Sequence, residues 1–339
     1  MADGGRLQAT RSADSIELRS AIQLSLKKGN EHANRDCDME HNAEVIGFGA
    51  LNCDRICRVD DLALPGREIG VISASRQPGG SAANTIVGLA RLGVKTGFLG
   101  TVGSDREGSE LLDDLRREGV DVHGITISEG DTGSALIFVD SRGERAIYVL
   151  PSVNDAFFAA NHDYALQAEI LHVSSFMGID QFRMQISYVR HLRGSRTKVS
   201  FSPGSIYAKL GLDQLKPLIE RTFTLFLNKE EAQQLTGSEG VEDAATLLDF
   251  GPNIIAVTLG DAGSYVATRS ESFYVAPYES QITDTVGAGD AFAAGFLYGQ
   301  LTGKNLHESG RYGNFMASKS VAQLGGRKGL LRDLRELRG

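Results

Sequence analysis

The second half of the chain alternates regularly between short apolar runs typical of strands and longer runs typical of helices. The expected strands are residues 169–173, 198–201, 222–227 and 254–259, and the expected helices are residues 181–192, 212–219, 229–235 and 241–250. A strand followed by a crossover helix returns parallel to its predecessor, and such units cover both faces of a sheet with helices. The alternation therefore predicts an α/β fold built on a parallel sheet.

The first half adds segments that do not fit this alternation. Its expected regular elements are a central strand at 44–51, a helix at 85–92, a strand at 95–102, a helix at 108–119 and a strand at 122–127. Between them, residues 58–75 carry strand-like pieces around Pro65-Gly66, and residues 132–150 alternate with period two on either side of a turn. We expect these pieces to form a small separate sheet, as a flap over a pocket.

Charge and cysteine content limit the class of protein. The formal net charge of −8 over 339 residues argues against a general nucleic-acid binder. Cys37, Cys53 and Cys57 do not make a disulfide framework, which favours a reducing compartment, and no second ligand pair accompanies Cys53 and Cys57 to bind a metal. Because no apolar run approaches about 18 residues and no signal core is present, we expect a cytoplasmic enzyme without a membrane partner.

Residues 1–43 differ in composition from the rest of the chain. They are polar, with one helix-like piece at 15–28, so a short amphipathic helix and a disordered extension are both open. We place this extension outside the folded core.

One glycine-rich stretch carries most of the chemical information. The small and apolar run at 291–301 predicts a buried helix, so Gly287, Ala288 and Gly289 lie where a loop becomes that helix. Their N–H groups lack intrahelical acceptors and share the positive end of the helix dipole, which suits a phosphate. Asp290 could take the proton of a substrate hydroxyl while these groups hold a transferring phosphoryl group. The alternative is that Asp284 or Asp290 caps the helix.

Two other motifs place amides and carboxylates near glycines. Asn52 and Asp54 follow the first expected strand, where open α/β sheets bind ligands, although both residue types also favour turns. Gly79 and Gly80 allow close approach of a ligand, and Asn84 lies one turn into the next helix. A glycine-rich helix start is also common without any function.

Polar residues follow two later strands. Asn228 and Glu231 lie one turn apart at a helix start, where they either hold the water shell of Mg²⁺ or form a helix cap with an acidic first turn. Thr258, Gly260 and Gly263 come after the strand at 254–259, at a nucleotide site or an ordinary hairpin entry.

Four of these motifs occur together in the order of one family. They are Gly-Ala-Leu-Asn-Cys-Asp at 49–54, Gly-Gly-Ser-Ala-Ala-Asn at 79–84, Asn-Lys-Glu-Glu at 228–231 and Asp-Thr-Val-Gly-Ala-Gly-Asp at 284–290. From residue 44 to 339 the chain resembles the PfkB family of small-molecule kinases, which have the ribokinase fold. The resemblance implies a doubly wound, mostly parallel sheet flanked by helices, with a small β lid formed by residues 54–78 and 123–150.

The resemblance also implies a role for each matching residue. ATP and Mg²⁺ would be the cofactors, Asp290 the catalytic base, and Gly287, Ala288 and Gly289 the anion hole. The substrate would be bound by Asn52, Asp54, Gly79, Gly80 and Asn84. The nucleotide would be bound by Asn228, Thr258, Gly260, Gly263 and Asn314, with Glu231 holding Mg²⁺ through water. Asp284 and the loop around Gly325-Gly326 resemble the monovalent-cation site of many members, which implies K⁺.

Two departures from ribokinase bear on the substrate. Ser81 stands where ribokinase has Lys, and Val-Ser-Ser-Phe at 173–176 stands where it has a ribose-contacting Glu, which puts ribose itself in doubt. We therefore expect an ATP-dependent kinase that phosphorylates a hydroxymethyl group of a small sugar or sugar-like molecule. The alternatives are a nucleoside kinase of adenosine-like specificity and, more remotely, a non-catalytic sugar-binding regulator. Because lids in this family often pair, a homodimer through the lid is expected.

Overall fold

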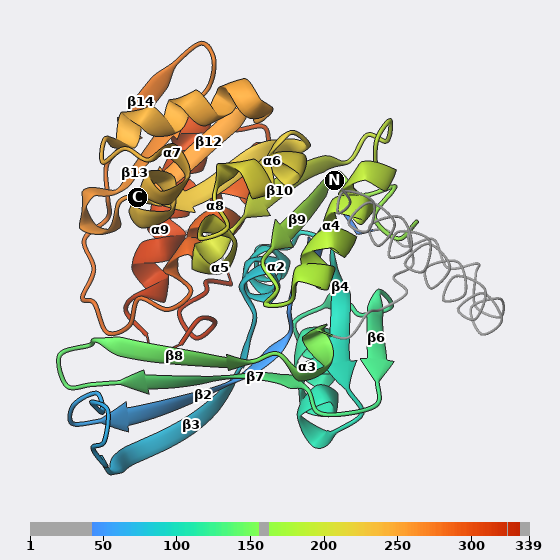
Figure 1. Ribbon diagram of the computed structural model, residues 1–339. Helices are drawn as coiled ribbons and strands as arrows, with labels where there is room; N and C mark the ends of the chain where they lie inside the picture. The colour runs from blue at the N-terminus through green and yellow to red at the C-terminus, as the bar shows by residue number, and fades with distance from the viewer. Residues whose placement is uncertain (1–42, 156–162, 324, 333–339) are drawn as a thin grey trace, which may run out of the picture. The chain divides into compact units, whose positions relative to one another are not determined.

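The computed structural model describes residues 43–155, 163–323 and 325–332 of the chain, and its larger sheet runs through the centre of Figure 1. Within the described residues this sheet has ten strands in the order β14-β13-β12-β11-β10-β9-β1-β4-β5, with β6 also paired to β4. The strands are β1 (Val45–Phe48), β4 (Thr96–Gly103), β5 (Val120–Asp121), β6 (Ile125–Ser128), β9 (Ile170–Ser174), β10 (Lys198–Ser202), β11 (Thr222–Asn228), β12 (Ile254–Thr258), β13 (Ser264–Ala267) and β14 (Ser272–Val275). All pairs are parallel except β12 with β13 and β13 with β14.

The strand order reverses at the central strand β1, because the chain first builds outward to β4 and then returns to β9 on the other side. Ligands of open α/β sheets bind where the order reverses, at the carboxyl ends of the strands. Three residues separate the carboxyl end of β1 from Asn52, where the chain enters the second sheet. The topology therefore predicts a ligand-binding site at this end of the sheet.

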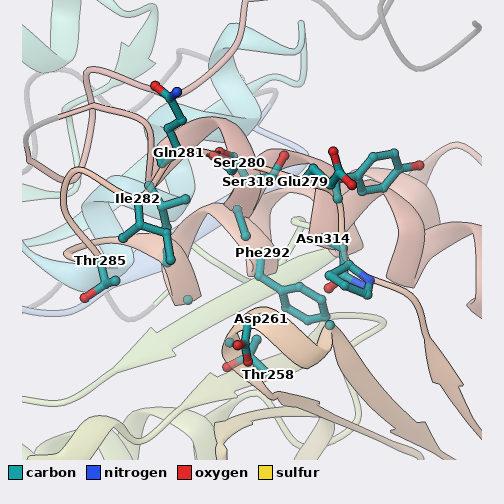
Figure 2. Close-up of a pocket in the computed structure, with 18 residues that line it drawn as sticks. Thr258, Asp261, Glu279, Ser280, Gln281, Ile282, Thr285, Phe292, Asn314 and Ser318 are labelled. Carbon is teal, nitrogen blue, oxygen red and sulfur yellow. Dashed lines mark hydrogen bonds between the residues drawn. The ribbon is translucent and has the colours of Figure 1, made fainter.

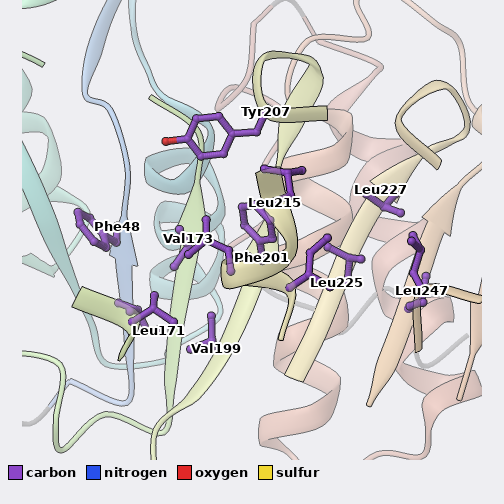
Figure 3. Packing of buried hydrophobic residues seen from close by; sticks show 14 of the residues in the cluster. Phe48, Leu171, Val173, Val199, Phe201, Tyr207, Leu215, Leu225, Leu227 and Leu247 are labelled. Carbon is purple, nitrogen blue, oxygen red and sulfur yellow. The ribbon is translucent and has the colours of Figure 1, made fainter. Parts of the chain in front are cut away.

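Helices cover both faces of the sheet, as the alternating sequence predicts. The helices are α2 (Ser81–Arg91), α3 (Arg106–Arg117), α4 (Ile179–His191), α5 (Gly204–Ala208), α6 (Leu212–Ile219), α7 (Lys229–Thr236), α8 (Ala288–Leu301) and α9 (Leu306–Ser320), with 3₁₀ turns η1 (Ser152–Asp155), η2 (Val241–Phe250) and η3 (Gly260–Ala262). Successive strand residues point to opposite faces, so Val45 belongs to one hydrophobic core and Ile46 to the other. Figure 3 shows the core that contains Phe48, Leu171 and Val173. The expected doubly wound architecture is confirmed.

A second, four-stranded sheet forms the lid. Its strands are β2 (Asn52–Val59), β3 (Val71–Gly79), β7 (Gly133–Val139) and β8 (Arg145–Leu150), in the order β3-β2-β7-β8. Figure 1 shows these strands as a separate sheet. Ile56, Ala135 and Ile137 form a small buried cluster of its own. A separate β lid, expected from the hairpin patterns, is therefore present.

The structure differs from the sequence expectation in two places. The segment 123–150 is expected to belong to the lid, but β6 pairs in parallel with residues 100–103 of β4 in the main sheet. Residues 241–250 are expected to be α-helical but form the 3₁₀ segment η2. Its buried residues Ala244, Leu247 and Leu248 follow a spacing that both helix types produce, so the hydrophobic pattern does not distinguish them.

Candidate active site

The glycine-rich loop and the start of helix α8 meet as the sequence predicts. Gly287 is the N-cap residue of α8, with φ of 78°, a left-handed conformation that favours glycine. A Cβ atom at this position would come within 2.6 Å of Gly326 Cα, so glycine is also required by space. A Cβ atom at Gly289, in contrast, would meet no atom within 4 Å. The first turn of α8 is therefore packed on one side and open on the other.

The main-chain donors of this loop differ from the simple expectation at one residue. The Ala288 N–H donates to the Thr285 carbonyl oxygen at 3.3 Å. Within the described part of the chain, the N–H groups of Gly287 and Gly289 donate to no main-chain acceptor. Two of the three expected N–H donors therefore have no main-chain partner of their own. They lie at the positive end of the dipole of the 14-residue helix α8.

Asp290 lies in the first turn of α8 and contacts the first turn of α2. Ser81 Oγ donates to Asp290 Oδ1 at 2.7 Å, and Asn84 Nδ2 donates to Oδ2 at 2.9 Å. Thr85 Oγ1 donates to the Asp290 main-chain oxygen at 3.3 Å. Burial raises the pKa of Asp290, while the hydrogen bonds from Ser81 and Asn84 oppose that shift. The carboxylate is oriented by two donors rather than used as the cap of its own helix.

Asn52 and Asp54 come from the first strand of the lid, since β1 ends at Phe48 and β2 begins at Asn52. They are two residues apart on β2 and so share a face, as expected. Asp54 lies against Gly79, where a Cβ atom would fall 2.2 Å from Asp54 Oδ2. Burial, with the nearby charge of Asp290, raises the pKa of Asp54 to about 7. The lid therefore carries a second carboxyl group close to Asp290.

Asn154 supports this end of the lid and was not singled out in the sequence. Its side chain accepts from Leu51 N–H at 3.2 Å and donates to the Leu51 carbonyl at 2.9 Å. It also donates to Asn52 Oδ1 at 2.8 Å. Asn154 is buried in η1, about 100 residues away in the chain, so no local sequence pattern relates it to Asn52.

Asp284 holds the glycine-rich loop against the segment that follows α9. Its Oδ1 accepts from Val286 N–H at 2.9 Å, and its Oδ2 accepts from Gly325 N–H at 2.8 Å. Arg145, at the start of lid strand β8, donates to Thr285 Oγ1 at 2.5 Å and lies 3.7 Å from Asp284 Oδ1. The lid therefore contacts the loop directly, through an arginine that sequence reasoning missed.

A pocket of about 990 Å³ opens beside this loop. Figure 2 shows the pocket between Thr258, at the end of β12, and Asn314, on α9. Of the residues expected to bind the nucleotide, Thr258, Gly260, Gly263 and Asn314 line it, whereas Asn228 does not. Ala288 and Gly289 of the expected anion hole line it as well. Asn314 Nδ2 donates to the carbonyl oxygens of Val275 and Ala276, at 3.0 and 2.9 Å, so this side chain holds the wall of the pocket in place. The size and the small lining residues suit a ligand as large as a nucleotide.

Asn228 and Glu231 form a capping box at the start of α7. Asn228 Oδ1 accepts from Glu231 N–H at 2.8 Å, and Glu231 Oε2 accepts from Asn228 N–H at 3.1 Å. Burial is the main cause that raises the pKa of Glu231 to about 7, and the charge of Asp290 adds to it. The cap interpretation thus holds, and Glu231 is also electrostatically coupled to the site. Among the described residues, no cluster of three or more His, Cys, Asp or Glu could hold a metal alone.

The pfkB family model, described as pfkB family carbohydrate kinase, matches residues 42–332. The chain belongs to this family. An uncharacterized sugar kinase of Archaeoglobus fulgidus is 40% identical over 253 residues, covering 73% of this chain and all of that protein. The ATP-dependent ribose-1-phosphate kinase of Halopiger xanaduensis is 32% identical, covering 84% of this chain and 93% of that protein. The adenosine kinase structure from Sinorhizobium meliloti has a TM-score of 0.79 at 25% identity, covering 87% of this chain and 99% of the other.

Membership in the pfkB family confirms the kinase activity and the ribokinase-like fold expected from the four motifs. Use of ATP is likewise a property of the family. In the part of the chain that the structure describes, no helix is both long enough and apolar enough to cross a membrane. The expectations for residues 1–43 fall almost entirely outside the described residues.

Proposed function

We propose that this pfkB-family kinase transfers the γ-phosphoryl group of ATP to a hydroxymethyl group of a small sugar or sugar-like acceptor, with Asp290 as the general base. The observation that supports this most strongly is the position of Asp290. Its carboxylate is held by Ser81 and Asn84 on one side of the α8 N-terminus, and the large pocket opens at Gly289 on the other. An alcohol and a terminal phosphate can meet between them.

Different side chains perform different steps of the proposed reaction. Asn52, Asp54 and Asn84, with the main chain at Gly79 and Gly80, bind acceptor hydroxyls. Asp290 receives the proton of the reacting hydroxyl, whose oxygen forms the new bond to phosphorus as the bond to the ADP oxygen breaks. The N–H groups of the glycine-rich loop stabilise charge on the transferring group. Lid closure excludes water, which would otherwise compete as the acceptor.

The two carboxyl groups near the acceptor have different roles in this proposal. The pKa of Asp54 near 7 means that it is partly protonated at neutral pH and can both donate to and accept from an acceptor hydroxyl. Burial raises the pKa of Asp290 as well, and the hydrogen bonds from Ser81 and Asn84 oppose that rise. The position of each group, not its pKa, therefore assigns the roles: Asp290 lies in the first turn of α8 next to Gly289, which lines the pocket, and Asp54 lies on lid strand β2.

The proposal also includes Mg²⁺ and K⁺, each held by specific residues. Mg²⁺ usually binds substrate phosphates and waters with only one or two carboxylates, so Glu231 beside Asn228 is sufficient on the protein side. Mg²⁺ supplies charge neutralisation to the transferring phosphate. Both carboxylate oxygens of Asp284 already accept main-chain hydrogen bonds, so K⁺ there would be held with carbonyl oxygens of the loop around Gly325-Gly326.

The acceptor class follows from an assay of acceptor-dependent ADP release over pentoses, hexoses, ketodeoxy acids, ribose 1-phosphate and nucleosides. Turnover with a sugar or sugar derivative supports the main proposal. The similarity to adenosine kinase favours a nucleoside as the second candidate, and preferential turnover of nucleosides would establish it. The absence of ADP release with every acceptor, while acceptors still bind, would support the non-catalytic regulator instead.

We also propose that the lid joins two copies of the chain. Large apolar side chains are exposed on the two edge strands of the lid: Val71, Ile72, Ile147, Tyr148 and Leu150. Exposed apolar residues gathered on one small sheet mark an interaction surface. Light scattering after size exclusion is expected to give a dimer for the wild type and a monomer for Ile147→Lys. A monomeric wild type at micromolar concentration would contradict pairing.

A further inference from the structure

Arg327 is a buried arginine at the centre of the acceptor side, in the segment that follows α9. Only 6% of its surface is exposed. Its Nη1 donates to Asp114 Oδ2 of α3 at 2.6 Å, and its Nη2 donates to the Gly79 carbonyl at 3.4 Å. Its Nε donates to Asn84 Oδ1 at 2.9 Å. A buried guanidinium is costly unless its donors are used, and here all three nitrogens have a partner.

The contact with Asn84 determines which way the Asn84 amide points. The amide carries an acceptor oxygen on one side and a donor nitrogen on the other. Arg327 can only donate, so it requires the oxygen on its side and leaves Nδ2 facing Asp290, at 2.9 Å. The opposite orientation would place Oδ1 against the Asp290 carboxylate and an N–H₂ group against a guanidinium, and both contacts would repel.

We propose that Arg327 is a positioning residue for phosphoryl transfer, which acts through Asn84 to orient the Asp290 carboxylate. Asp114 anchors the guanidinium, and the order of contacts is Asp114, Arg327, Asn84, Asp290. The inference rests on the proposed role of Asp290 as base. It adds that a charge on the C-terminal segment, which contacts Asn84 rather than Asp290 itself, sets the geometry of that base.

The charge of Arg327 has a second, electrostatic effect on the same site. The charged groups that face Asp290 are Asp54 from the lid, Glu231 from α7 and Arg327, while Ser81 and Asn84 donate to it. Arg327 lowers the pKa of both Asp290 and Asp54, against the effect of burial. Its removal raises the pKa of both groups, so the acid limb of kcat moves to higher pH.

The test compares Arg327→Gln and Arg327→Lys with Arg332→Gln. Arg332 is an exposed arginine on the same segment that contacts only Glu118 among its described partners, at 3.4 Å, and serves as the control. Arg327→Gln is expected to lower kcat on the order of 10–100-fold, the usual range for a lost charge-assisted hydrogen bond, and to shift the acid limb upward. Arg327→Lys keeps the charge and restores the pH profile, but recovers kcat only in part because one amine cannot replace the three donors. Arg332→Gln is expected to behave as the wild type.

A double-mutant cycle separates positioning from loss of fold. In an Asn84→Ala background, with kcat measured at a pH above the acid limb so that the electrostatic effect does not contribute, Arg327→Gln is expected to lower kcat by less than about twofold further, because the intermediary is already absent. An equal loss in both backgrounds, or a kcat and pH profile of Arg327→Gln that match the wild type, would overturn the inference.

A crystal structure of Arg327→Gln gives a readout that does not depend on turnover. The inference predicts that Asn84 Nδ2 no longer lies within hydrogen-bond distance of Asp290, whereas the contact persists in Arg332→Gln. Retention of the 2.9 Å contact in Arg327→Gln would overturn the inference. If the wild type releases no ADP with any acceptor, the proposed function fails, and this crystallographic comparison still decides the role of Arg327. If Arg327→Gln does not fold, the same comparison is made with Arg327→Lys, in which the Asn84 contact is expected to lengthen.

Discussion

The proposed acceptor side and the proposed nucleotide side of the candidate site are built in different ways. On the acceptor side, side chains from the lid, α2, α8 and the C-terminal segment contact one another, and Asn84 and Arg327 are almost fully buried. On the nucleotide side, a pocket of about 990 Å³ is lined by the glycines Gly260, Gly263 and Gly289 together with larger side chains such as Tyr278 and Phe292. One side is a network of side-chain hydrogen bonds, and the other is an open space.

This difference corresponds to the two tasks of a kinase. The reacting hydroxyl has to be oriented and deprotonated, which requires charged groups fixed in place before the reaction. The nucleotide has to bind and leave, and its phosphates are well served by main-chain N–H groups at a helix N-terminus. Changes on the acceptor side should therefore affect turnover, and changes on the nucleotide side should affect ATP binding as well.

Asp290→Asn removes the proposed base from the acceptor side and has the largest expected effect on kcat. The amide keeps the size of the carboxylate but cannot take a proton, so kcat should fall by about 10²–10⁴-fold. The KM for ATP should change little, because the pocket at Gly289 is unaltered. Steady-state kinetics of ADP release measure both values, with Asp261→Asn, a change in the pocket lining, as the matched control. Near-normal turnover of Asp290→Asn would remove Asp290 from the base role.

Gly289→Val tests the nucleotide side, because it adds a side chain where the pocket meets the α8 N-terminus. No protein atom lies within 4 Å of the added Cβ, so the fold should be retained, and the side chain should occupy space meant for phosphate. We expect kcat/KM for ATP to fall by about 10–100-fold, comparable to the loss of one donor from an anion hole. Gly70→Val is the control, since its Cβ also meets no atom and Gly70 is not among the residues that line the pocket. Equal kinetics for the two variants would show that the phosphate does not approach Gly289.

Arg145→Gln tests the connection between the lid and the glycine-rich loop. Removal of the contacts with Thr285 and Asp284 should leave the lid less well docked over the loop. We expect kcat to fall by about tenfold and acceptor-independent ATP hydrolysis to rise, because water is less well excluded. Arg142→Gln changes a neighbouring lid arginine that pairs with Asp140 and Asp61, and should leave both rates unchanged. Identical hydrolysis rates in the two variants would argue against the docking role.

Much of the fold was predictable because hydrophobic periodicity reports burial directly. The alternation at 169–259 gave the parallel sheet, and the run at 291–301 gave α8, since these segments are buried on both sides. The error at β6 has the same origin. A four-residue strand pairs equally well with the lid or with β4, and no side-chain pattern distinguishes the two partners.

The arrangement of the candidate site was predictable where it is local in sequence. The loop at Gly287–Asp290 and the capping pair Asn228 and Glu231 each lie within one helical turn, so their spacing carries the information. Arg145, Asn154 and Arg327 reach the site from remote segments. Their contacts with the site span 102 to 243 residues of chain, which a single sequence does not encode in any readable pattern.

Asp54→Asn gives the smallest expected effect and concerns stability. The pKa of Asp54 is raised to about 7 when folded, from an ordinary value of 3.8, so the folded state binds more protons between these values. This group therefore lowers stability as pH rises from about 4 to 7. Asp54→Asn should unfold about 1–2 °C higher than the wild type at pH 8, a small shift since the carboxyl is partly exposed, with no gain at pH 4. Thermal unfolding of the ligand-free protein measures this, and a gain at pH 4 with none at pH 8 would reverse the assignment.

The most direct test of phosphoryl transfer to an alcohol is the stoichiometry of the wild-type reaction with its best acceptor. ADP and the phosphate ester are measured together, by coupled assay and by mass spectrometry. We predict one ester for each ADP, with little inorganic phosphate and with both products lost in Asp290→Asn. Formation of ADP with inorganic phosphate and no ester would contradict the account.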